Sequence, residues 1–536
     1  MPTTVEVIAE AMKESGTPFI VGHPGGESVE LMDAARQRDM RFILMKQETA
    51  GAMLAATWGE ITGSPGICLS TRGPGATNMV NGIAYAALDR APLIAITDQY
   101  GPTTYSIGLR QRIDHLAIYG PLVKWGTTVN ARSVRQQMRR ALRVATAPAP
   151  GPVHFDLPQT ETTLQAAEPV AEAPLLANVL APPPDRASLK APLDMLAKAR
   201  KPIILVGLGV LWARASAEVT ALAERLGAPV LTTPKCKGAI SEDHPLRAGC
   251  IIGGIIERNL VNQADLIVAI GLDAIELQPK PWPYTLPVLS IAETAALDAA
   301  VPAGLELVGP LKGVLAAITE HASDGTGWGE KAAKSFREQV VDALNVPTRG
   351  LSPHRAMEIA RAVLPRETIA TADAGASRLL VVQKWQSYAP REFLTSSGLG
   401  SMGYAIPGAL AARLAYPDRP VVAFTGDGGF MMALAELQTA KRDDLPIIVV
   451  VLDDEEISMI RVKQQIKQIP IYGVGIGGVG WDKLAQGLGA DGVIVDREAA
   501  LADALGAALK SGRTTVIGVK IDGSCYVDQF NALREL

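Results

Sequence analysis

Residues 426–429, Gly-Asp-Gly-Gly, have the types and spacing of a site for a phosphate and a metal ion. They follow directly on the apolar run 421–425, which predicts a buried strand that breaks into a turn at Gly426. Glycine lets backbone N–H groups approach phosphate oxygens, and a helix beginning near Met431 would add its positive N-terminal end. Asp427 supplies a carboxylate of the kind that binds Mg²⁺ or Ca²⁺. The same residues would also suit an ordinary tight turn between a strand and a helix.

A second carboxylate follows one predicted helix and one predicted strand later. The apolar run 447–452 predicts the next parallel strand, and Asp454 comes two residues after it. Because the carboxyl ends of neighbouring parallel strands meet at one edge of a sheet, we expect Asp427 and Asp454 to face one ion.

Glycine-rich loops also follow predicted strands in the first third of the chain. The strand at 19–21 leads into a loop that contains His23 and Gly25, and the strand at 67–70 leads into a Gly-Pro-Gly turn at 73–75. Glycine at these places allows close approach of the backbone to a ligand.

Glu48 lies between the predicted strand 42–45 and a predicted helix over 49–59. Two interpretations stay open at this point. The carboxylate either stabilises the helix dipole from the N-terminal end, or is partly buried at the edge of the sheet and bonds a ligand.

The elements that must position these residues follow an α/β pattern, because apolar runs alternate with helical segments along the chain. We expect three doubly wound parallel-sheet domains, at 1–168, 185–335 and 346–536, with a Pro-rich linker at 169–184. The strand candidates are 19–21, 42–45, 67–70, 93–97 and 153–157 in the first domain, 201–209, 229–233 and 264–271 in the middle domain, and 368–371, 421–425, 447–452, 493–495 and 515–519 in the third.

Composition excludes several classes of protein. The net charge of −4 argues against a nucleic acid or an anionic membrane as a partner. The four cysteines have no metal-binding or disulfide spacing, and no apolar run is long enough to span a membrane. With no signal-peptide pattern at its N-terminus, we expect a soluble cytoplasmic protein.

Together these motifs resemble a known family. Gly-Asp-Gly followed some two dozen residues later by a pair of Asn residues is the thiamine diphosphate signature, and here Asp453-Asp454 replaces the Asn pair. The segments Gly-His-Pro-Gly-Gly-Glu at 22–27, Glu48 with Ala-Gly, Arg-Gly-Pro-Gly-Ala-Thr-Asn at 72–78 and Pro-Leu-Val-Lys-Trp at 121–125 resemble the pyrimidine-binding domain of the acetolactate synthase, pyruvate oxidase and benzoylformate decarboxylase family.

The resemblance implies roles for individual residues. Mg²⁺ would be bound by Asp427, Asp454 and the backbone carbonyl of Glu456, while Glu48 would bond the cofactor's pyrimidine and Met402 would hold its two rings together. His23 and Gln111 are further candidates for catalysis. The implied contacts to thiamine diphosphate are Gly25, Gly75, Asn78, Gly375, Ala376, Ser377, Gly400, Met402, Gly426, Asp427, Gly428, Gly429, Asp454, Glu456 and Ile457.

The resemblance also implies an activity. We expect decarboxylation of a pyruvate-like 2-keto acid and ligation of the product to a second carbonyl, in a homodimer or tetramer whose active sites lie at the subunit interface. The alternatives are a 2-keto acid decarboxylase that releases an aldehyde, and a non-catalytic cofactor-binding paralogue. FAD in the middle domain is possible but not favoured, because Gly-x-Gly at 207–209 is too short a nucleotide fingerprint. The family's first and third domains share a topology.

Three cations depart from the family pattern. Arg72 replaces a small residue before Gly-Pro-Gly, Arg110 stands where an aromatic residue is usual, and Lys463 occupies the position of a Trp. Each either binds an acidic substrate or is a solvated surface charge.

Overall fold

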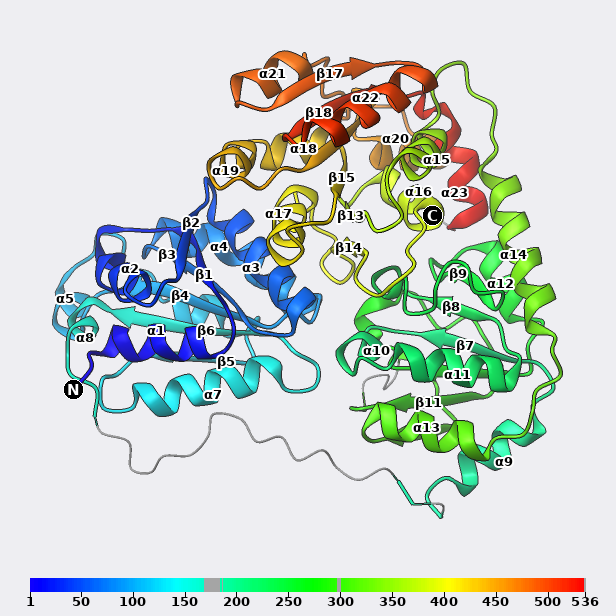
Figure 1. The fold of residues 1–536 in the computed structure, drawn as a ribbon, viewed down its shortest axis with the longest axis horizontal. Coiled ribbons are helices and arrows are strands. Elements are labelled where there is room, and N and C mark those ends of the chain that lie inside the picture. The colour runs from blue at the N-terminus through cyan, green and yellow to red at the C-terminus, as the bar shows by residue number, and fades with distance from the viewer. Residues whose placement is uncertain (168–183, 186, 296–299, 535–536) are drawn as a thin grey trace.

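The computed structural model describes residues 1–167, 184–185, 187–295 and 300–534. Its strands form three six-stranded parallel sheets, each covered by helices (Figure 1). This confirms the predicted fold class. The predicted linker at 169–184 lies, apart from Pro184, outside the described residues, and the predicted domain bounds stay predictions.

The first sheet has the strand order β2-β1-β3-β4-β6-β5. Its interior strands are the continuous apolar runs of the sequence, as expected for strands buried on both faces. The edge strand β5 was not predicted, because it is short and half polar. The six strands are β1 (Phe19–His23), β2 (Arg41–Leu44), β3 (Gly66–Ser70), β4 (Leu93–Gln99), β5 (Trp125–Thr128) and β6 (Pro152–Pro158).

The third sheet, ordered β14-β13-β15-β16-β18-β17, repeats the topology of the first, as the resemblance implied. The three-residue edge strand β14 was missed. The strands are β13 (Ile369–Ala372), β14 (Phe393–Thr395), β15 (Val421–Gly426), β16 (Ile448–Asp453), β17 (Asp491–Val495) and β18 (Thr515–Lys520).

The middle sheet is ordered β12-β11-β10-β7-β8-β9, which is the doubly wound order of dinucleotide-binding folds. The sequence prediction found three of its four interior strands and missed the interior strand β11 and both edge strands. The strands are β7 (Pro202–Val206), β8 (Val230–Thr232), β9 (Arg247–Cys250), β10 (Leu266–Ile270), β11 (Val288–Ala292) and β12 (Leu305–Val308).

Five helices matter most for the site. Helix α3 was predicted over 49–59 and begins one residue earlier, so that Glu48 lies in its first turn. Helix α18 begins at Asp427 rather than near Met431, because the glycines after Asp427 adopt helical conformation. The five are α3 (Glu48–Thr62), α4 (Pro74–Leu88), α17 (Ala405–Ala415), α18 (Asp427–Ala433) and α20 (Ser458–Ile466).

The remaining helices cover the sheet faces, fill the domain edges or form single turns. They are α1 (Thr4–Glu14), α2 (Val29–Arg36), α5 (Pro102–Ile107), α6 (His115–Tyr119), α7 (Val134–Thr146), α8 (Gln159–Thr162), α9 (Lys190–Lys198), α10 (Gly209–Trp212), α11 (Ser216–Leu226), α12 (Ile255–Val261), α13 (Leu311–His321), α14 (Gly329–Leu344), α15 (Pro353–Val363), α16 (Ala376–Lys384), α19 (Glu436–Arg442), α21 (Trp481–Gly487), α22 (Glu498–Ser511) and α23 (Tyr526–Leu533).

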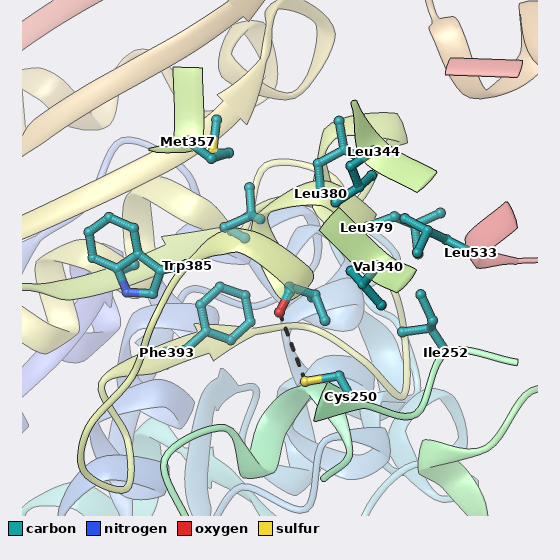
Figure 2. Close-up of a cluster of buried hydrophobic side chains, with 14 of the residues drawn as sticks. Cys250, Ile252, Val340, Leu344, Met357, Leu379, Leu380, Trp385, Phe393 and Leu533 are labelled. Atoms are coloured by element: carbon teal, nitrogen blue, oxygen red, sulfur yellow. Dashed lines mark hydrogen bonds between the residues drawn. The ribbon is translucent and has the colours of Figure 1, made fainter. Parts of the chain in front are cut away.

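The third domain packs against both of its neighbours. One core joins it to the middle domain around Cys250, Trp385 and Phe393 (Figure 2), where the Cys250 Sγ lies 3.9 Å from the Val382 carbonyl oxygen. A second core joins it to the first domain, where α17 packs on α3. The three domains therefore meet through buried apolar surface. No helix within the described ranges is long and apolar enough to cross a membrane.

Candidate active site

Asp427 is a buried carboxylate with one unsatisfied oxygen. Its Oδ1 accepts a hydrogen bond from the Gly428 N–H at 2.7 Å, and its buried Oδ2 has no partner among the described residues. Burial raises the pKa of Asp427 to about 7, and the nearby charges of Asp454 and Asp453 add to the rise. A buried carboxyl group with one unpartnered oxygen, which ionises with difficulty unless a positive charge is nearby, fits a cation ligand.

Asp454 lies beside Asp427, as the strand order requires. Strands β15 and β16 pair in parallel with Gly426 opposite Leu452, so the two acidic residues leave the sheet at the same edge. The Asp454 Oδ2 accepts a hydrogen bond from the Ser458 hydroxyl, and burial raises the pKa of this carboxyl. Within the described part of the chain, no group of three or more His, Cys, Asp or Glu side chains could hold a metal. The arrangement fits a site of two carboxylates completed by a backbone carbonyl.

The loop that follows Asp454 is held from the other side by residues 474–476. Glu455 adopts a left-handed backbone with φ of 61°, and Glu456 forms an antiparallel bridge with Gly475. The Ile457 N–H bonds the Val474 carbonyl at 2.8 Å. The Glu456 side chain pairs with Arg461 at 2.5 Å, so it points away from a ligand role, and only its backbone carbonyl stays a candidate.

Met402 lies against the Gly-Asp-Gly-Gly turn. A Cβ atom added to Gly428 would meet the Met402 methyl group at 3.4 Å, which shows that the two predicted cofactor contacts are neighbours. Gly400 has a φ of 67°, and Gly375, shortly after β13, has a φ of 141°. Both have open space at the position that a Cβ atom would take. Ala376 and Ser377 form the first turn of α16.

Asp373 ties these loops together and was missed as a site residue. Its carboxylate accepts hydrogen bonds from the Tyr404 N–H and the Thr425 hydroxyl, both at 2.8 Å. Burial raises the pKa of Asp373 to about 6. A sequence signal was present, since Asp373 comes two residues after the end of the predicted strand 368–371, but nothing in its spacing distinguishes it from any loop Asp.

In the first domain, the structure brings Glu48, Asn78 and Gly75 together. The Asn78 side-chain amide donates to Glu48 Oε2 at 3.2 Å. A Cβ atom at Gly75 would stand 3.2 Å from Glu48 Oε1, so a larger residue there would crowd the carboxylate. Glu48 is buried at the start of α3, which agrees with a carboxylate at the sheet edge placed to bond a ligand.

His23 and Gln111 each lie against the backbone of a neighbouring segment. The His23 ring nitrogen Nδ1 lies 3.0 Å from the Met45 carbonyl oxygen, and Gly25 lies beside Thr71. Gln111 is exposed, has a left-handed backbone with φ of 57°, and lies against Gly73. The loop of Gln111 therefore contacts the Gly-Pro-Gly turn.

The three unusual cations differ in burial. Arg72 is 9% exposed, forms an ion pair with Glu27 and stacks over the Tyr100 ring at 4.0 Å, while its Nε and Nη1 have no hydrogen-bond partner among the described residues. Arg110 and Lys463 are exposed. Of the three, Arg72 is thus the buried one, and two of its guanidinium nitrogens are not used by any described residue.

Comparison with known proteins gives matches in all three domains. The descriptions of the matching family models are thiamine pyrophosphate enzyme, N-terminal TPP binding domain, for residues 2–118, central domain for 189–318, and C-terminal TPP binding domain for 373–519.

Curated relatives match over most of their length. The chain is 32% identical over 480 residues to a probable acetolactate synthase large subunit of Methanocaldococcus jannaschii, covering 85% of this chain and 80% of the relative. It is 31% identical over 477 residues to the acetolactate synthase isozyme 2 large subunit of Escherichia coli, covering 86% and 84%. It is 27% identical over 542 residues to an acetolactate synthase of Bacillus subtilis, covering 98% and 94%.

Two half-sites, Glu48 with Asn78 in the first domain and Asp427 with its glycine turn in the third, lie in the stretches that the N-terminal and C-terminal TPP binding domain models match. The chain therefore belongs to the thiamine pyrophosphate enzyme family, as an acetolactate synthase-like enzyme with thiamine diphosphate as its cofactor.

Proposed function

We propose that this enzyme decarboxylates a pyruvate-like 2-keto acid and ligates the product to a second carbonyl compound. The observation that carries the proposal is the match to relatives named acetolactate synthase over four fifths or more of their length. The Glu48 and Asp427 half-sites support it, because they supply the two groups that such a cofactor needs.

The proposed cofactor site uses both half-sites. Asp427, Asp454 and the Glu456 carbonyl would hold Mg²⁺, and the N-termini of α18 and α16 would receive the diphosphate. Bound thiamine diphosphate supplies the carbanion and the electron sink of the reaction. Further proposed contacts are Gly25, Gly75, Asn78, Gly375, Ala376, Ser377, Gly400, Met402, Gly426, Gly428, Gly429 and Ile457.

The chain's own residues would then hold and move protons. We assign to Glu48 the proton shared with the pyrimidine ring nitrogen, with Asn78 fixing the carboxylate from its other side. His23 at the end of β1 and Gln111 beside the Gly-Pro-Gly turn would face the reacting carbonyl. Arg72 would bind the carboxylate of the 2-keto acid through the guanidinium nitrogens that have no hydrogen-bond partner among the described residues.

We infer a homodimer or tetramer with the active site between subunits. Large apolar side chains stay exposed beside both half-sites, and a second copy of the chain would cover them. They are Val29, Ile107 and Leu109 in the first domain and Met431, Met432, Ile457 and Ile460 in the third. We also place the enzyme in the cytoplasm, since its four cysteines are buried and free.

The direct test of this function is a product analysis combined with Glu48→Gln. The unaltered enzyme, supplied with thiamine diphosphate, Mg²⁺ and 2-keto acids singly and in pairs, is expected to release CO2 and form a coupled product. Aldehyde without coupling would favour the simple decarboxylase. Glu48→Gln is expected to abolish turnover while calorimetry shows cofactor binding largely intact, because the diphosphate anchor is in the third domain. Unchanged turnover in this variant would contradict the role of Glu48.

A further inference from the structure

Asp89 is a fully buried carboxylate of the first domain that binds a loop of the third domain. It follows α4, the helix that begins at the Gly-Pro-Gly turn. Both of its oxygens accept hydrogen bonds from the segment after β14. The donors are the backbone N–H groups of Ser397 at 2.7 Å, Gly398 at 3.2 Å and Leu399 at 3.3 Å, and the Ser396 hydroxyl at 3.1 Å.

This segment leads directly to two proposed cofactor contacts, Gly400 and Met402. The Ser396 hydroxyl oxygen, held by Asp89, accepts hydrogen bonds from the N–H groups of Gly400 at 3.1 Å and Ser401 at 3.3 Å. The Asn81 amide of α4 donates to the Ser401 hydroxyl at 2.9 Å. The Met402 loop is thus held from the first domain through Asp89 and Asn81, as well as by Asp373 of its own domain.

Lys235 of the middle domain compensates the charge of Asp89. Its Nζ lies 2.8 Å from Glu60 Oε2, 3.1 Å from Asp89 Oδ1 and 3.3 Å from the Thr395 carbonyl oxygen, with the side chain almost completely buried. Burial alone would lower the pKa of Lys235, but the charges of Asp89 and Glu60 raise it above its usual value, so the lysine stays protonated. All three domains meet at this ammonium group.

The energetics make this junction sensitive. A buried carboxylate is tolerated only when ionic partners and hydrogen-bond donors replace its hydration. Asp89 obtains the ionic partner from the middle domain and the donors from the loop. Loss of either partner therefore leaves a buried charge incompletely compensated next to the loop that leads to Met402.

We propose that Asp89 is a positioning residue that sets the Gly400–Met402 loop for thiamine diphosphate, and that the middle domain supports cofactor binding through Lys235. The inference gives the middle domain a role in the site without requiring a nucleotide there. It rests on the proposed contacts of Gly400 and Met402 with the cofactor.

Ser396→Ala tests the proposal with little risk to folding, because it removes the link from Asp89 to Gly400 and Ser401 without leaving a buried charge unpaired. Calorimetric titration of the full-length apoenzyme with thiamine diphosphate and Mg²⁺ is expected to give a Kd about five- to tenfold higher, from the loss of net hydrogen-bond energy. The thermal midpoint of the apoenzyme should change little. A lowered midpoint with an unchanged Kd would overturn the proposal.

Four further variants complete the test. Ser387→Ala is the matched control, since Ser387 is equally buried in the third domain and its hydroxyl has no partner within the described residues, so its Kd should not change. Lys235→Arg keeps the positive charge and should bind the cofactor far better than Lys235→Met; equal Kd values would contradict the role of Lys235.

Met402→Ala separates the proposed cofactor contact of Met402 from the positioning role of Asp89. If it leaves the Kd unchanged, the proposed role of Met402 fails; if it weakens binding and Ser396→Ala does not, the positioning role fails.

Discussion

Asp453 and Asp454 are adjacent in the sequence but have different surroundings. Asp453 accepts a hydrogen bond from the Trp481 ring N–H at 2.6 Å and pairs with Lys520 at 2.8 Å. Lys520 also pairs with Glu455 at 2.8 Å. The acidic character of the loop is therefore largely neutralised within the protein, and Asp454 is left to act with Asp427. An Asp in the place of the family's usual Asn therefore adds one charge to the proposed metal site rather than four.

Arg72 gives the first prediction at the scale of the residue. If its guanidinium binds the substrate carboxylate, Arg72→Gln should raise the KM for the 2-keto acid about tenfold or more, the usual effect of losing a charge-assisted hydrogen bond. The KM for an acceptor aldehyde, which has no carboxylate, should change less. Steady-state kinetics in which the 2-keto acid and the aldehyde are varied in turn measure this difference. Arg110→Gln is the control, because Arg110 is exposed, and equal effects of the two variants would refute the assignment.

Asp98 gives a prediction of pH dependence. It is buried and forms no ion pair with the residues that the structure describes. Burial raises its pKa from 3.8 to about 7, with the Ser28 hydroxyl and Arg72 opposing the rise and Glu27 and Glu30 adding to it. Because the folded state favours the protonated carboxyl, protonated Asp98 contributes to the free energy of unfolding. This contribution is complete below about pH 4 and is lost as the pH rises through about 7.

Asp98→Asn cannot ionise and should escape this loss. Relative to the unaltered enzyme, the variant is expected to gain stability between pH 5 and pH 8, by about 2 kcal/mol or more at the upper end. Thermal midpoints of both proteins at the two pH values are the measurement. A constant difference between the midpoints would show that Asp98 does not titrate in this range.

At the scale of the element, Glu436 in α19 binds the two residues that precede α3. Its carboxylate accepts hydrogen bonds from the N–H groups of Lys46 and Gln47, both at 3.1 Å, and from the Thr439 hydroxyl at 2.7 Å. Helix α3 begins at the next residue, Glu48. A carboxylate of the third domain thus fixes the segment that presents the proposed catalytic carboxylate of the first.

Glu436→Gln should therefore lower kcat about tenfold, since each lost charge-assisted bond loosens the segment before Glu48. The Kd for thiamine diphosphate should change less, because the diphosphate anchor lies in another loop. Kinetics and calorimetry on the same preparation separate the two effects. Glu498→Gln, at the exposed start of α22, is the control and should be silent in both.

The sequence predicted the elements whose signal is local. Parallel strands buried on both faces are continuous apolar runs, so the interior strands of the first and third sheets could all be located, and three of the four interior strands of the middle sheet. The edge strands β5 and β14 were missed because they are short. The carboxylates Asp89 and Glu436 could not be found, since their partners lie 308 and 389 residues away in the sequence and no periodicity connects them. Glu48 and Asp427 were found because each follows a predicted strand within a motif that resembles the thiamine diphosphate family.

At the scale of the whole molecule, the decisive question is whether Glu48 and Asp427 of one chain serve the same active site. The first and third domains have the same sheet order, and within one chain α17 packs on α3. We expect the cofactor to bind between the first domain of one subunit and the third domain of another.

Complementation between two inactive variants tests this arrangement. Glu48→Gln removes the pyrimidine-binding carboxylate, and Asp427→Asn weakens the metal site, so each homodimer should be inactive. If active sites form between subunits, a heterodimer of the two variants has one site with both substitutions and one site with neither, and it should show about half of the unaltered activity because one of two sites is complete. If each chain builds its own site, both sites of the heterodimer carry one substitution and the mixture stays inactive. Co-expression with two different affinity tags isolates the heterodimer, and its CO2 release per mole distinguishes these outcomes.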